Sequence, residues 1–311
     1  MNKDIIFLTP VCTHNIWGGT RLNREFGYPI EGDDIGECWG ISAHPNGDGT
    51  VASGAYKGMK LSELWEKHPE LFGDTGMDRF PLLVKIIDAK DDLSIQVHPD
   101  DAYAKAHENG SLGKTECWFI LDCKENATLV VGHNAKTKEE LEQMIHEGRW
   151  KEFIREIPIK PGDFIQIDPG TVHAIKGGTL LLETQQSSDI TYRVYDYDRL
   201  SNGKPRQLHI VQSIDVITVP AKSADNSVVH IEKKDDAIQQ LIQCPYYTVY
   251  RIDVEHRVET WQDKPFVLMS VVEGEGTLNG TPLKKGDHLI LPDGYGKVEL
   301  QGRMQIIAST I

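Results

Sequence analysis

Four polar side chains in the first two thirds of the sequence have the types and spacing of a metal site. Gln96 and His98 are two positions apart in the stretch DDLSIQVHPDD (91–101), so on an extended strand both point to the same face. Glu116 begins the alternating run ECWFI, and His173 follows the turn DPGT. Two imidazoles, a carboxylate and a neutral amide suit a borderline divalent ion: zinc fits, and iron, cobalt and manganese remain alternatives.

A structural role is the ordinary explanation for a single histidine, and the chain has 12 of them. We expect this role for His44, His68, His107, His133, His209 and His256. The set of four residues above differs because its members fall on one unit and each strand orients its polar group consistently.

The elements that must position these residues are mostly short strands, because glycine (28) and proline (15) recur between apolar segments. We expect strands at 80–89, 117–123, 127–132, 163–168 and 266–272. Helical periodicity is confined to residues 60–73 and 137–157, and the second helix opens with a Thr137…Glu140 capping box. The sequence therefore predicts a mainly β fold with a helical insertion at about 134–157.

An internal repeat divides the chain. KPGDFIQIDPGTVHAI (160–175) aligns without a gap on KKGDHLILPDGYGKVE (284–299), which predicts two related β modules. His173 of the first copy is matched by Lys297 in the second, so we expect metal in the first module alone. The polar stretch 221–228 is the expected boundary, giving a metal-binding catalytic domain at 1–220 and a degenerate domain at 221–311.

Composition limits the partners. A formal net charge of −14 argues against general binding to nucleic acid or to an anionic membrane. Five cysteines without a CxxC motif predict reduced thiols, and no signal sequence or membrane-spanning run is visible. We expect a cytoplasmic protein with a small-molecule partner, present as a monomer or homodimer.

The motifs QVHPDD, KTE and PGTVHAI, in this order and spacing, resemble the metal-site motifs of type I mannose-6-phosphate isomerases, which are members of the cupin superfamily. WGG (17–19), GECWGISAHPNG (36–47) and LLETQQSSDITYRVYDYDR (181–199) also resemble blocks of that family, and the length resembles its short bacterial branch.

The resemblance implies two cupin-like jelly-roll modules and one Zn²⁺ per chain, held by Gln96, His98, Glu116 and His173. It implies that mannose 6-phosphate and fructose 6-phosphate are interconverted, and that Arg193 is an active-site arginine. After Arg193 the segment VYDYDRLSNGKPRQ is longer and more charged than the family block.

Aldose–ketose isomerisation moves a proton between C1 and C2 through a cis-enediol(ate), so it needs a base and an electrophile that stabilises the oxyanion. Arg193 can assist the metal as a permanently charged donor. Glu183 is our candidate base, with His98 and Asp189 as alternatives, and Glu183 can equally be a partner that orients a metal-bound histidine.

The substrate phosphate needs fixed positive charge or hydrogen-bond donors. Lys114 is the first candidate, Arg206 and Lys204 come second, and Ser42 can donate through its hydroxyl group.

Two rival functions use the same residues. An iron-dependent cupin oxygenase presents two histidines and a carboxylate with open positions, and Gln96 in a fourth position argues against it. A sugar-phosphate sensor needs no Lewis acid, so the full ligand set with Arg193 argues against that function.

Overall fold

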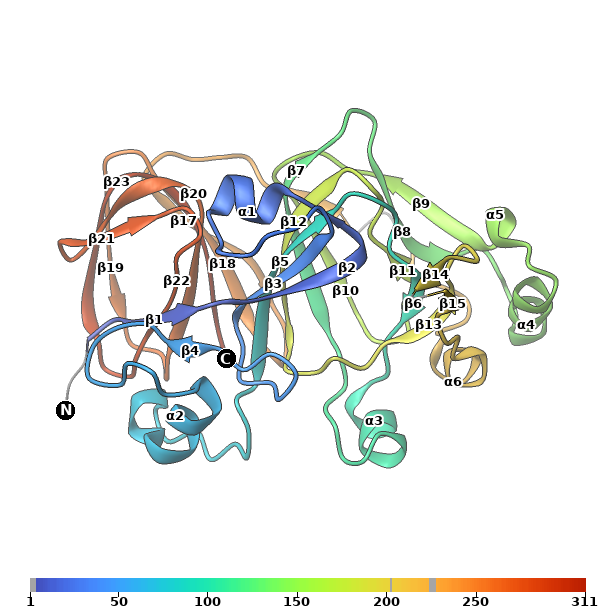
Figure 1. Cartoon of the computed structure of the whole chain (residues 1–311), viewed down its shortest axis with the longest axis horizontal. Helices are drawn as coiled ribbons and strands as arrows, with labels where there is room; N and C mark the ends of the chain where they lie inside the picture. Colours follow the sequence, from blue (N-terminus) through green and yellow to red (C-terminus); the bar gives the residue numbers. More distant parts are fainter. Residues whose placement is uncertain (1–3, 202, 224–227) are drawn as a thin grey trace.

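The computed structural model describes residues 4–201, 203–223 and 228–311. The chain forms two lobes that lie side by side, each built from antiparallel strands, with the helices at the periphery (Figure 1). The prediction of a mainly β fold is confirmed. Among the described residues, no helix has both the length and the apolar character needed to cross a membrane.

The first lobe contains a seven-stranded sheet with fully buried central strands. Its strand order is β16 (Val228–His230), β10 (Asp163–Ile167), β7 (Glu116–Cys123), β12 (Thr179–Gln186), β5 (Leu82–Ala89), β2 (Val11–Gly19) and β3 (Ile35–Ile41).

A five-stranded sheet completes the first lobe. Its order is β13 (Tyr192–Tyr195), β6 (Ile95–Val97), β11 (His173–Ala174), β8 (Thr128–His133) and β9 (Ile154–Pro158). Side chains from both sheets, among them Trp118, Ile165, Leu129 and Ile175, form one apolar cluster. The interior between the two sheets is therefore a packed core, and the polar residues found in it need a specific reason to be there.

The second lobe is a nine-stranded sheet around its own apolar core. Its order is β17 (Ala237–Gln243), β18 (Thr248–Val254), β23 (Gly296–Thr310), β20 (Val267–Leu278), β22 (His288–Leu291), β1 (Ile6–Thr9) and β4 (Thr50–Val51), with β19 (Arg257–Gln262) on β23 and β21 (Thr281–Lys284) on β20.

Each lobe takes strands from both ends of the chain. The N-terminal β1 pairs with β22 of the second lobe, and β16, which follows residue 220, pairs with β10 of the first lobe. Residues 224–227 of the expected boundary lie outside the described residues. The division at 220/221 stays a prediction.

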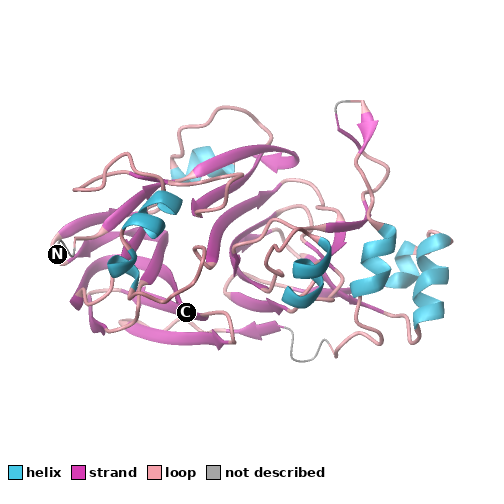
Figure 2. Ribbon diagram, turned by 90° about the horizontal axis from the view of Figure 1, so that it is seen from below, coloured by secondary structure: helices cyan, strands magenta, loops and turns pink. Residues whose placement is uncertain are grey.

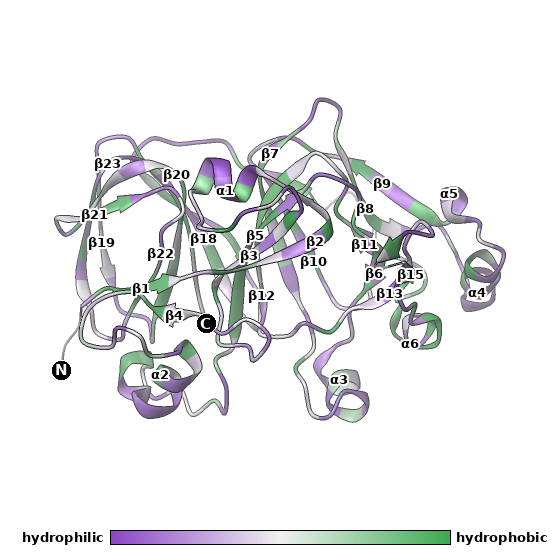
Figure 3. Cartoon of the chain, viewed as in Figure 1, coloured by the Kyte–Doolittle hydropathy of each residue, from purple (hydrophilic) through white to green (hydrophobic). Residues whose placement is uncertain are grey.

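The helices lie outside the sheets (Figure 2). They are α1 (Arg21–Phe26), α2 (Leu61–Lys67), the 3-10 helix η1 (Pro69–Phe72), α3 (Asp101–His107), α4 (Lys138–His146), α5 (Trp150–Phe153) and α6 (Ile210–Val216). Helices α4 to α6 pack on the five-stranded sheet through a separate cluster that includes Val130, Leu141 and Phe153. The hydropathy colouring agrees, since apolar residues concentrate in the strands while α3 and α4 are mostly polar (Figure 3).

Both predicted helices are shorter than expected. The first breaks at His68–Pro69, because proline lacks the N–H that would continue it, and Gly73 (φ 70°) ends the following turn. The segment 137–157 contains two helices, α4 and α5, separated by residues 147–149, and β9 then pairs with β8. The prediction of one helix over 137–157 was therefore wrong at 147–149 and at 154–157, where the chain forms an edge strand that ends at Pro158.

One of the two hydrogen bonds of the predicted capping box forms at the start of α4. The hydroxyl group of Thr137 accepts a hydrogen bond from the backbone N–H of Glu140 at 3.2 Å. The Glu140 carboxylate instead accepts from the backbone N–H of Lys136 at 2.7 Å. The helix thus begins where the sequence predicted it.

The two repeat copies adopt the same turn. Gly162 and Gly286 have φ values of 88° and 92°, which only glycine adopts readily. Asp163 then accepts from the backbone N–H of Lys160, and Asp287 from that of Lys284, at 2.8 Å in both cases. These matched contacts support the duplication.

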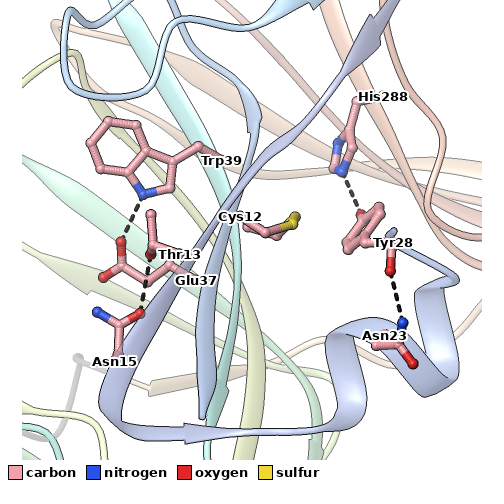
Figure 4. Close-up of a disulfide and its surroundings, with 9 residues drawn as sticks. Cys12, Thr13, Asn15, Asn23, Tyr28, Glu37, Trp39 and His288 are labelled. Carbon is pink, nitrogen blue, oxygen red and sulfur yellow. Dashed lines mark hydrogen bonds between the residues drawn. A yellow bond between two sulfur atoms is a disulfide. The ribbon is translucent and has the colours of Figure 1, made fainter. Parts of the chain in front are cut away.

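The expectation of five reduced thiols was wrong. Cys12 on β2 and Cys38 on β3 form a disulfide, while Cys117, Cys123 and Cys244 are free (Figure 4). The two bonded cysteines are direct partners in the β2–β3 register. Because pairing across strands depends on register, residue counting along the sequence did not find it.

Candidate metal centre and active site

Strand pairing brings two of the predicted ligands, Gln96 and His173, onto one surface of the five-stranded sheet. His173 on β11 is the direct partner of Gln96 on β6, and Arg193 on β13 is the direct partner of Gln96 on the other side. Directly paired residues of antiparallel strands point to the same face. His98 follows β6, and Glu116 begins β7 in the facing sheet.

Three of the four predicted ligands converge within a few ångströms. The Nε2 atoms of His98 and His173 are 3.1 Å apart, and each lies 3.4 Å from an oxygen of Glu116. His173 and Glu116 are 0% exposed. Ligands about 2.0–2.2 Å from a tetrahedral zinc ion would lie about 3.3–3.6 Å from each other, so the spacing fits such an ion.

Both histidines offer a lone pair to the cluster. Nδ1 of His173 donates to the carbonyl oxygen of Thr171 at 2.8 Å, which leaves its Nε2 unprotonated. Burial lowers the pKa of His173, and burial together with the charge of Lys114 lowers the pKa of His98 to about 3. Both rings are therefore neutral at pH 7, as metal ligation requires.

Glu116 supplies the negative charge. Although burial raises its pKa, the charge of Lys114 and the interaction with the His98 ring outweigh that effect and hold the pKa well below its usual value. Neither carboxylate oxygen accepts a hydrogen bond from the described residues. A buried carboxylate that faces two neutral imidazoles, with Lys114 as its ion-pair partner, is a donor set suited to a divalent cation.

Gln96, the fourth predicted ligand, lies beside the cluster. Its side-chain amide nitrogen lies 3.3 Å from Nε2 of His173. Because the two ends of the amide exchange places on rotation by 180°, Gln96 can present its oxygen at this position.

Lys114 lies inside the cluster. Its Nζ is 3.0 Å from Glu116 and 3.2 Å from Nε2 of His98, and the side chain is buried. The residue precedes β7, yet its side chain reaches the same interior.

Glu183 is also buried and lies on the same sheet face as Glu116, where it accepts a hydrogen bond from Nε1 of Trp118 at 3.1 Å and pairs with Lys85 at 3.5 Å. Burial, together with the charge of Glu116, raises its pKa. Lys85 also pairs with Glu37 at 3.5 Å and lies over the ring of Trp39, whose Nε1 donates to Glu37 (Figure 4).

Sequence reasoning missed Lys85 and Glu37. The one available signal was a single lysine in the otherwise apolar run LLVKII of β5. A buried lysine needs carboxylate partners, but those partners come from other strands, which the sequence does not identify.

The remaining candidates lie further out. Arg206 binds Asp196, and Lys204 is exposed. The hydroxyl oxygen of the buried Ser42 accepts from the backbone N–H of His44 at 3.1 Å, and His44 lies 3.5 Å from Asp189.

The chain is similar to known families and proteins over most of its length. A family model described as phosphomannose isomerase type I, catalytic domain, matches residues 5–121, and one described as mannose-6-phosphate isomerase, cupin domain, matches residues 237–311. The chain is 51% identical to mannose-6-phosphate isomerase ManA of Bacillus subtilis (strain 168) over 99% of both chains. It is 48% identical to mannose-6-phosphate isomerase of Streptococcus mutans over 98% of this chain and 97% of that protein.

Solved structures extend the comparison. The mannose 6-phosphate isomerase from Bacillus subtilis matches with a TM-score of 0.95 at 51% identity, over 99% of each chain. A variant of phosphomannose isomerase from Salmonella typhimurium matches with a TM-score of 0.81 at 16% identity, over 98% of each chain, and shares the fold. With half of its residues identical to full-length relatives, and with matches to both domain models, the chain belongs to the type I mannose-6-phosphate isomerase family of enzymes.

Proposed function

We propose that this chain is a metal-dependent isomerase that interconverts mannose 6-phosphate and fructose 6-phosphate. The observation that carries the proposal is the buried group of His98, Glu116 and His173, whose ligand atoms lie within 4.8 Å of one another. The printed names of the relatives support the substrate.

We propose one Zn²⁺ per chain, held by Gln96, His98, Glu116 and His173. Two neutral imidazoles with a carboxylate and an amide oxygen match zinc better than a hard, oxygen-preferring cation. When bound, the ion supplies Lewis-acid polarisation of the substrate oxygens.

The protein groups supply proton transfer and charge stabilisation. Glu183 is the candidate base for the proton that moves between C1 and C2, because burial raises its pKa toward the working pH and Trp118 and Lys85 fix its carboxylate. Arg193 shares a sheet face with Gln96, and its guanidinium stays charged although burial lowers its pKa. In this arrangement Arg193 donates to the oxyanion of the cis-enediolate.

Lys114, Arg206 and Ser42 are the proposed contacts of the substrate. Lys114 is the cation nearest to the ligand cluster, which places it beside the reacting end or the phosphate of a bound sugar. We propose further that the protein works in the cytoplasm as a monomer or homodimer, and that residues 1–220 form the catalytic domain and 221–311 a degenerate cupin-like domain.

The test is incubation of purified protein of known metal content with mannose 6-phosphate in D₂O. We expect fructose 6-phosphate to form and deuterium to enter at C2 of recovered substrate, with both lost after chelation and restored by Zn²⁺. Absence of product and of deuterium from zinc-loaded protein would refute the proposal.

A further inference from the structure

Asp196 is a buried carboxylate that binds two arginines beside the candidate site. It directly follows β13 and is 4% exposed. Arg206 donates to it through both Nε and Nη2, with Nε 2.7 Å from Oδ2, and Arg199 donates through Nη2 at 2.6 Å from Oδ1. One carboxylate therefore fixes two points of the segment that follows it.

The segment between these points turns sharply. Tyr197 and Asp198 have φ values of 55° and 56°, a conformation that residues other than glycine and asparagine seldom adopt. The backbone N–H of Arg199 then donates to the carbonyl oxygen of Asp196 at 3.1 Å. A short hairpin, β14 (Leu200–Ser201) and β15 (Lys204–Pro205), leads the chain on to Arg206.

The same segment contacts Arg193 directly. Nη1 of Arg193 donates to the carbonyl oxygen of Gln207, the residue after Arg206, at 2.8 Å. Two further hydrogen bonds join the backbone of Arg193 to His209, at 3.1 and 2.8 Å. Because Arg193 is the strand partner of Gln96, a continuous series of contacts runs from Asp196 to the metal ligands.

Asp196 also has an electrostatic effect on the neighbouring arginines. Burial lowers the pKa of Arg193, and the charges of Arg206 and Arg199 lower it further, while Asp196 acts in the opposite direction. The carboxylate thus holds three guanidinium groups close together that would otherwise repel one another.

We propose that Asp196 is a positioning residue for Arg193: by binding Arg206 it fixes the Gln207 carbonyl oxygen, which directs the Arg193 guanidinium toward substrate at the metal centre. The inference rests on the proposed function, in which Arg193 contacts the substrate.

The test is a double-mutant cycle of Asp196→Asn and Arg193→Lys, with kcat, KM and metal content measured for each protein. We expect each single change to lower kcat about 10- to 100-fold, since misplacement of a catalytic group by 1 Å can cost about 100-fold. Because Asp196 acts through Arg193, the kcat of the double variant should lie within about threefold of the kcat of the less active single variant. Metal content should stay at one ion per chain.

The matched control is Asp253→Asn in the second lobe. Asp253 is also buried, and it binds the buried Arg251 at 2.8 Å. This change removes the same charge from a similar ion pair. We therefore expect it to lower the melting temperature about as much as Asp196→Asn does, with kcat unchanged.

Two outcomes would overturn the proposal: kcat of Asp196→Asn equal to that of the Asp253→Asn control, or losses that multiply in the double variant. If Asp196→Asn does not fold, Asp196→Glu keeps the charge but displaces the carboxylate from Arg206, and it must show the same non-additivity with Arg193→Lys. Equilibrium binding of mannose 6-phosphate, measured by calorimetry over the same cycle, does not require turnover. An inactive wild-type protein would therefore refute the proposed function, while additive losses in binding would still refute the role of Asp196.

Discussion

The two copies of the repeated turn differ at one position that matters for metal binding. His173 is fully buried and faces Glu116, whereas Lys297 at the matched position is 57% exposed and pairs with Glu259 at 2.8 Å. The backbone turn is the same in both copies, so the difference lies in the side chain and in the residues that surround it.

We predict that His173→Ala will remove both metal and activity, while Lys297→Gln will change neither. Loss of a partner that only orients a ligand typically costs 10- to 100-fold in metal affinity, and loss of a ligand should cost at least as much. Metal content by mass spectrometry, with kcat on mannose 6-phosphate, measures both effects. Metal loss in Lys297→Gln would contradict the assignment of the site to one lobe.

At this scale the sequence predicted which side chains lie together, because Gln96 and His98 follow strand alternation and His173 follows a recognisable turn. It could not predict that Lys85 joins Glu37 and Glu183, since three strands distant in sequence must pair before those side chains meet. Arg206 was expected near a phosphate, and its contact with Asp196 could not be read from the sequence because it depends on a turn with two unusual φ values.

At the scale of elements, strands were easier to predict than helices. The five expected strands correspond to β5, β7, β8, β10 and β20, since runs rich in valine, leucine and isoleucine between glycines are typical of buried strands. The predicted helices are interrupted where proline or glycine stands: at Pro69 in the first, and at Gly148 (φ 65°), between α4 and α5, in the second. Local pattern identifies an element more reliably than it identifies its ends.

The disulfide between β2 and β3 provides a prediction for these elements. Its cysteines are 26 positions apart, and the chain-entropy model assigns a loop of this size about 3 kcal/mol of stability. We expect the free energy of unfolding of the Cys12→Ser, Cys38→Ser double variant to be lower by that amount. The double variant should therefore unfold at a lower urea concentration than the wild-type protein.

The control is dithiothreitol, which should lower the urea midpoint of the wild-type protein and leave that of the double variant unchanged. Equal midpoints for the reduced and oxidised wild-type protein would show that the bond does not contribute to stability.

At the scale of the whole molecule, a buried polar contact joins the lobes. Nε2 of His288 on β22 bonds to the hydroxyl group of Tyr28 at 2.7 Å (Figure 4), and its Nδ1 bonds to Ser270 at 2.8 Å. Tyr28 follows α1 and belongs to the N-terminal part of the chain. Both ring nitrogens are thus satisfied in the neutral state.

This contact predicts a dependence of stability on pH. Burial lowers the pKa of His288 to about 3, whereas a histidine in the unfolded chain titrates near 6.5. Between these values the unfolded state binds the proton and the folded state does not, so the free energy of unfolding falls as pH drops, by up to about 1.4 kcal/mol per pH unit from this group.

We expect His288→Gln to reduce that slope when urea unfolding is followed from pH 7 to 4.5. His146→Gln, at the exposed end of α4, controls for the general loss of a histidine. Identical slopes for wild type and His288→Gln would mean that the pKa of this ring is the same in the folded and unfolded protein, and would contradict the prediction.

The pairing of β1 with β22 has a consequence for the order in which the protein is made. The first strand to leave the ribosome has only the two-residue β4 as an early partner, and its main partner is translated some 280 residues later. Until then the edge of β1 is open to pairing with other chains. Synthesis must therefore approach completion before the molecule can close, and a nascent chain that stalls near its end would expose a strand that the finished enzyme hides.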